Sequence, residues 1–121
     1  GHCPLIFFNN EKNKASFIEP QGLGLGLEQG KKFSQIIEEK TIRLNPNDLF
    51  LFYTDGVVEA RNNFQEEFGE KHLLEETASI AQLGARDIRK KLVQEVQTFE
   101  GVTKPHDDLT LVVVKVKSLL V

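Results

Sequence analysis

The strongest constraint on the fold is a short apolar run, Leu49–Tyr53 (LFLFY), that leads directly into Thr54-Asp55-Gly56. Both alternating sets of side chains in the run are apolar or aromatic, so neither face of such a strand suits water. We therefore predict a central strand covered on both sides. Asn45-Pro-Asn-Asp48 precedes the run as a turn. A core segment thus ends in a carboxylate, Asp55, and the rest of the chain has to explain why.

Three further segments predict strands. Pro4–Phe8 and Ala15–Ile18 are short apolar runs on either side of the polar Asn9–Asn13, a pattern typical of a hairpin. The end of Phe33–Leu44 alternates polar and apolar residues, which suggests another strand. Leu109–Lys117 is rich in β-branched residues and closes the chain as a strand.

Two segments predict helices. Glu70–Leu83 and Arg86–Phe99 carry apolar residues at helical spacing, and Gly84 and Gly101 are suitable stop signals. Their short connection makes them an antiparallel pair. The predicted class is α+β, a mainly antiparallel β-sheet with the helix pair packed on one face.

Composition limits the possible functions. The 121 residues suit one domain, and 40% hydrophobic with 27% charged residues are ordinary globular values. A net charge of -3 gives no reason to expect nucleic-acid binding. The apolar runs are far shorter than a membrane span. The lone Cys3 cannot form an internal disulfide, so a reducing, cytoplasmic setting is expected.

Carboxylates occur at the ends of two predicted central strands. Asp55 follows Leu49–Tyr53, and Asp107 and Asp108 directly precede Leu109. If the two strands are antiparallel neighbours, these carboxylates meet at one edge of the sheet, where they repel unless a cation lies between them. Oxygen clusters of this kind suit Mg²⁺ or Mn²⁺. The alternative is plain turn and loop chemistry, which accounts for each motif taken alone.

Four segments, in order, carry a family resemblance: GHCPLIFF, LNPNDLFLFYTDGVVEARN, EEFGEKHL and HDDLTLVVVKV. Together they resemble PPM-type (2C-like) bacterial serine/threonine phosphatases of the RsbU/SpoIIE type, over nearly the whole chain. The resemblance implies that Asp55 and Asp107 are divalent-metal ligands, with Asp108 as a neighbour or an alternative ligand. It also implies hydrolysis of phosphoserine or phosphothreonine on a regulatory protein, such as an anti-anti-sigma factor, by a metal-activated water.

One departure from that family concerns its earlier half, where an Asp-Val-x-Gly-like segment supplies an aspartate that bridges two metal ions. Before Asp55, this chain has only Asp48, which lies in the predicted turn. Residues 1–121 are therefore expected to be the C-terminal part of a phosphatase domain, with at most a weak partial metal site and little activity alone. The missing N-terminal half is then an expected partner.

Two other interpretations stay open. A non-catalytic interaction module could keep the phosphatase scaffold and bind a protein. Exposed strands of a half domain also predict a homodimer or a larger assembly.

The remaining candidate residues favour structural roles. Gly22-Leu-Gly-Leu-Gly26 lacks the strand and helix context of a nucleotide-binding loop. His2 and His106 flank the phosphatase-like motifs but are not expected to be catalytic. Cys3 is expected to be a small buried residue, and His72 a surface residue of the first helix.

Overall fold

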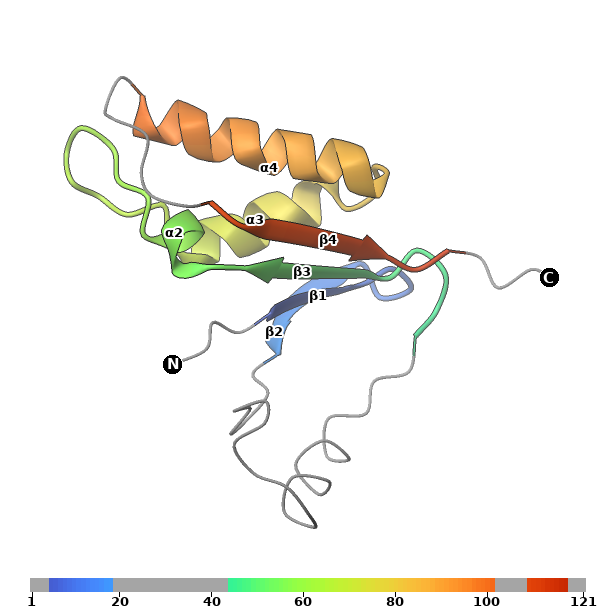
Figure 1. Cartoon of the computed structure of the whole chain (residues 1–121). Coiled ribbons are helices and arrows are strands. Elements are labelled where there is room, and N and C mark those ends of the chain that lie inside the picture. Colours follow the sequence, from blue (N-terminus) through green and yellow to red (C-terminus); the bar gives the residue numbers. More distant parts are fainter. Residues whose placement is uncertain (1–4, 19–43, 102–108, 118–121) are drawn as a thin grey trace, which may run out of the picture.

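A computed structural model describes residues 5–18, 44–101 and 109–117, and these form an antiparallel sheet with helices over one face (Figure 1). The predicted strand at the end of Phe33–Leu44 lies outside the described residues except for Leu44, as do the loop Gly22–Gly26 and His2, Cys3 and His106. The α+β class predicted from the sequence is confirmed.

The sheet has four strands in the order β2-β1-β3-β4, and every neighbouring pair is antiparallel. Strands β1 (Leu5–Asn9) and β2 (Lys14–Ile18) form the predicted hairpin. Strand β3 (Leu49–Tyr53) lies between β1 and β4 (Leu111–Lys115), as expected of a central strand. Among the described strands, β2 and β4 are therefore the edges.

The helical layer is an antiparallel pair, α3 (Glu70–Ile80) and α4 (Ala85–Glu100), packed over one face of the sheet (Figure 1). Helix α4 ends at Gly101, whose φ of 66° favours glycine. Helix α3 ends three residues before the predicted Leu83. Gly84 is the N-cap of α4, not the stop of α3.

A side chain of β4 contacts the connection that follows α3. The Lys115 ammonium donates hydrogen bonds to the carbonyl oxygens of Ala81, at 3.0 Å, and Leu83, at 2.6 Å. Carbonyls at the end of a helix lack intrahelical partners, and a cation satisfies them well. Lys115 thus ties the last strand to the connection between the two helices.

One hydrophobic core lies between the sheet and the helices. Its fully buried members come from every layer. They include Ile6, Phe8, Leu49, Leu51, Leu73, Ile88, Leu92 and Val96. On β3, the alternate residues Leu49, Leu51 and Tyr53 face this core.

The opposite face of the sheet is also apolar, and this corrects the prediction of a strand covered on both sides. We call it the apolar sheet face; its members are Phe7, Phe50, Phe52, Val112 and Val114. Phe7 and Phe50 are in ring contact, with centroids 4.9 Å apart. Yet Phe52 and Val114 are each 44% exposed and Val112 is 49% exposed. Both faces of β3 are apolar as predicted, but within the described residues only the face toward the helices is fully buried.

Candidate metal centre at the end of β3

Asp55 lies where β3 passes into α2 (Asp55–Val58), a single helical turn. The preceding Thr54 is still extended, with φ −102° and ψ 167°. Buried Val57 and Val58 anchor the turn in the core, while Asp55 itself is exposed. The alternative interpretation of the sequence was a plain Asp-Gly turn, whereas the structure has a helical turn that begins at Asp55, at the rim of the sheet.

The register of β3 and β4 brings this rim together. Tyr53, the last residue of β3, is paired with Leu111, the first residue of β4. Beyond that pair, the N–H of Thr54 donates to the carbonyl oxygen of Thr110 at 3.2 Å. The N–H of Thr110 donates to Thr54 Oγ1 at 3.3 Å. The predicted antiparallel neighbour relation between the two strands is confirmed.

Asp107 and Asp108 lie outside the described residues, so their role as metal ligands stays a prediction. The two residues that follow them, Leu109 and Thr110, are described. Thr110 is hydrogen-bonded to Thr54, which directly precedes Asp55. Within the described part of the chain, no group of three metal-ligating side chains includes Asp55.

Asp48, in contrast, has a structural role. It is fully buried, and its carboxylate oxygens accept hydrogen bonds from the N–H groups of Asn10, at 2.9 Å, and Asn45, at 2.8 Å. Its own N–H donates to the Asn45 carbonyl, which confirms the predicted turn. Asp48 is fully buried and lies at the opposite end of β3 from Asp55, so it does not take the place of the bridging aspartate of the resembled phosphatases.

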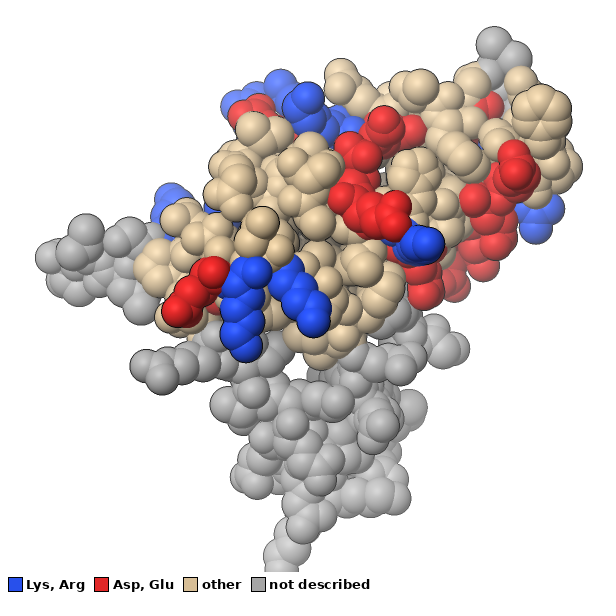
Figure 2. All heavy atoms as spheres, turned by 180° about the vertical axis from the view of Figure 1, so that it is seen from behind, with Lys and Arg blue, Asp and Glu red and all other residues tan. Residues whose placement is uncertain are grey.

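The loop after α2 folds back beside the same rim. The N–H of Phe68 donates to the Ala60 carbonyl at 2.7 Å, and Gly69 to Val58 at 2.9 Å. Exposed acidic side chains (Glu59, Glu66, Glu67 and Glu70) border this loop. Figure 2 shows acidic side chains gathered on the right; this is the left side of Figure 1, where α2 and this loop lie, because Figure 2 is seen from behind. Acidic surfaces of this kind raise the local concentration of cations.

Residues 1–117 match the family described as Stage II sporulation protein E (SpoIIE). The chain belongs to the SpoIIE family. The resemblance inferred from the sequence motifs is thereby confirmed for almost the entire chain.

Comparisons with individual proteins agree with the SpoIIE family. Protein IcfG of Synechocystis sp. is 27% identical over 115 residues, which cover 94% of this chain and 17% of that protein. The SiaA-PP2C domain of Pseudomonas aeruginosa superposes with a TM-score of 0.70 at 15% identity, covering 93% of this chain and 42% of that one. The phosphatase domain of SpoIIE from Bacillus subtilis superposes with a TM-score of 0.64 at 18% identity, covering 99% of this chain and 49% of that one. The structural matches show a PP2C-domain fold, and the chain spans less than half of each relative.

The exposed carboxylate of Asp55 suits the divalent ions that PP2C-type domains of this family generally use. Mg²⁺ and Mn²⁺ prefer carboxylate oxygen, and Mg²⁺ keeps several of its water ligands, which an open rim accommodates.

In the described ranges, no helix is both long enough and apolar enough to cross a bilayer.

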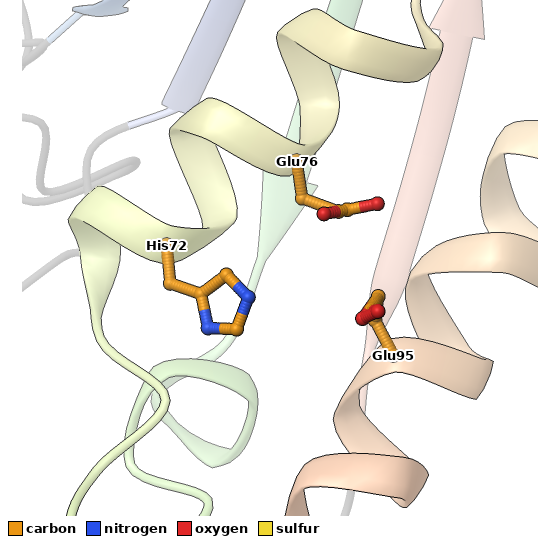
Figure 3. Close-up of side chains that lie close together, drawn as sticks. All are labelled: His72, Glu76 and Glu95. Carbon is orange, nitrogen blue, oxygen red and sulfur yellow. The ribbon is translucent and has the colours of Figure 1, made fainter.

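Sequence reasoning missed a second group of ligand-type side chains in this SpoIIE-family chain. His72, Glu76 and Glu95 lie together between α3 and α4 (Figure 3). His72 was expected on the surface but is half-buried, with its ring stacked on Phe68. The spacing of His72 and Glu76 by one helical turn was a visible signal. The position of Glu95 opposite them depends on how the helices pack.

Proposed function

We propose that residues 1–121 form the C-terminal part of a PPM-type protein phosphatase domain. The complete domain would hydrolyse phosphoserine or phosphothreonine on a regulatory protein such as an anti-anti-sigma factor, in the cytoplasm. The observation that carries the proposal is the position of Asp55 at the rim of the central strand, next to the Thr54–Thr110 hydrogen bonds, in a member of the SpoIIE family.

In this proposal Asp55 and Asp107 hold Mn²⁺ or Mg²⁺, and Asp108 is a neighbour or an alternative ligand. When bound, such ions activate water as a nucleophile and offset negative charge on the transferring phosphoryl group. The chain's own contribution is orientation. The buried Val57 and Val58 anchor the carboxylate of Asp55, and the β3–β4 register holds the entry of β4 beside it.

A complete centre requires more than this chain. The carboxylate of Asp48 already accepts two hydrogen bonds from backbone N–H groups. This chain covers only 42% and 49% of the two solved PP2C-type chains, so each of them extends well beyond the matched part. We therefore propose that the other half of the domain covers the apolar sheet face and completes the metal site. Alone, the chain would have weak activity or none, and it would self-associate through its exposed apolar surface.

The test compares the chain alone with the complete protein, by phosphate release from a phosphoserine peptide in the presence of Mn²⁺. We expect turnover by the complete protein, loss of turnover after Asp55→Asn or Asp107→Asn, and loss after chelation. Asp87→Asn, an exposed change in α4, is the matched control and should keep the activity.

Two results would overturn this account. Strong turnover by the isolated chain that Asp55→Asn abolishes would show that the missing half is dispensable. A complete protein that binds no Mn²⁺ and releases no phosphate would favour the rival function, a non-catalytic interaction module built on the phosphatase scaffold.

A further inference from the structure

A second cluster of metal-ligating side chains lies away from the rim, in the helical layer. The ligand atoms belong to the imidazole of His72 and the carboxylates of Glu76 and Glu95, and they all lie within 4.8 Å of one another. Figure 3 shows the three side chains converging on the space between α3 and α4. All three residues are half-buried.

The helices and their aromatic neighbours hold this geometry. His72 and Glu76 are one turn apart, so they share one face of α3. The imidazole is stacked on Phe68, with ring centroids 3.9 Å apart, and meets Phe99 edge-on at 6.0 Å. Phe68 and Phe99 are themselves in edge contact at 5.4 Å. The ring is thus oriented by packing before any ligand binds, which lowers the cost of binding.

The electrostatics of the cluster are unbalanced. Within the part of the chain that the structure describes, neither carboxylate of the pair Glu76 and Glu95 has an ion-pair or hydrogen-bond partner. Lys91 lines the same hollow but makes no ion pair with either carboxylate there. Facing carboxylates repel each other unless a cation is shared between them.

Beside the two carboxylates is a hollow with a volume of about 190 Å³, lined by Glu76, Lys91, Gln94, Glu95 and Thr98. It is polar and roomy enough for several water molecules. Three protein donors together with space for water are the arrangement that an open, partly hydrated metal site requires.

We propose that His72, Glu76 and Glu95 bind one divalent transition-metal ion of the Zn²⁺ class, which links α3 to α4. The imidazole nitrogen distinguishes the site from an all-oxygen Mg²⁺ site. Donors about 2.1 Å from a tetrahedral ion lie about 3.4 Å apart. Small rotations of the two flexible Glu side chains bring the cluster to that spacing. The bound ion stabilises the helical layer and is independent of the rim at Asp55.

The experiment uses the metal-free chain, titrated with Co²⁺ as a coloured stand-in for Zn²⁺ and monitored by visible absorption, with thermal unfolding in Zn²⁺ as the second readout. We expect one equivalent of Co²⁺ to bind and Zn²⁺ to raise Tm. His72→Ala and Glu95→Gln should each weaken Co²⁺ binding by about tenfold or more. Glu95→Gln nearly preserves shape, so it keeps the test valid if His72→Ala disturbs the packing of Phe68.

Three controls separate this site from others. Glu75→Gln changes an exposed carboxylate on the same helix and should leave binding unchanged. Asp55→Asn should also leave it unchanged, which separates the result from the phosphatase proposal. A variant in which His2→Ala, Cys3→Ser and His106→Ala are combined removes every other histidine and cysteine and should still bind.

The proposal is overturned by any of three results. The first is absence of Co²⁺ binding, and the second is binding that survives both His72→Ala and Glu95→Gln. The third is binding that disappears in the combined His2, Cys3 and His106 variant.

Discussion

Thr54 and Thr110 are joined by two hydrogen bonds at the end of the central strand pair, one between backbone groups at 3.2 Å and one to the Thr54 hydroxyl at 3.3 Å. They close the ladder of β3 and β4 next to Asp55. Any ligand set built from Asp55 and the residues before β4 depends on this closure, because it sets where β4 begins relative to the end of β3.

Replacement of Thr54 by valine removes the hydroxyl acceptor but keeps the shape of the side chain. Both threonines are exposed, so a water molecule can accept the hydrogen bond from the Thr110 N–H instead. The free energy of unfolding should therefore fall by no more than about 1 kcal/mol. The Mn²⁺ concentration needed for half-maximal phosphatase activity of the complete protein should rise several-fold. Thr54→Ser keeps the oxygen and should behave like the wild type. Equal metal requirements for Thr54→Val and wild type would contradict the role given to this bond.

Asp48 is expected to contribute strongly to stability. Its buried carboxylate accepts hydrogen bonds from the N–H groups of Asn10 and Asn45, and so connects the β1–β2 turn to the turn before β3. Asp48→Ala leaves both donors without their acceptor and should lower the free energy of unfolding by about 2–5 kcal/mol. Urea denaturation measures the change, with Glu11→Ala, an exposed change in the neighbouring turn, as the control. A loss below about 1 kcal/mol would mean that water replaces the carboxylate.

Lys115 provides a separate test of the contact between β4 and the helices. Lys115→Met keeps most of the side-chain bulk but removes the donor to the carbonyls of Ala81 and Leu83. Hydrogen bonds from a charged donor contribute about 1.5–3 kcal/mol, so a loss in that range is expected in thermal or urea unfolding. Lys117→Met, at an exposed position of the same segment, should change stability little. Equal effects of the two substitutions would indicate that general charge, not these bonds, is responsible.

The apolar sheet face predicts self-association of the isolated chain. Phe52 and Val112 are paired across β3 and β4 and are 44% and 49% exposed. Changing both to threonine retains β-propensity and reduces apolar surface, so assemblies seen by sedimentation should shift toward monomer with little loss of stability.

The matched control for that experiment is Phe64→Thr. Phe64 is 83% exposed but lies in the loop after α2, outside the apolar sheet face. The Phe64→Thr substitution should leave the assembly state unchanged. A wild-type chain that stays monomeric at high concentration would contradict the prediction.

Periodicity and turn chemistry in the sequence were sufficient for the main elements. The β1–β2 hairpin, the limits of β3 and the end of α4 at Gly101 all follow from local patterns. These patterns act over a few residues, where apolar alternation, helical spacing and glycine's access to positive φ determine the backbone. The same local motifs also carried the family resemblance that the comparison confirmed over residues 1–117.

What the tertiary structure decided involves residues far apart in the chain. Lys115 reaches the connection after α3 from β4. Glu95 meets His72 and Glu76 only because α4 packs beside α3 in one particular register. No short pattern encodes these encounters, because they arise from the joint packing of strands and helices on one core. The sequence therefore determined the elements and the family, while long-range packing decided which charged groups meet.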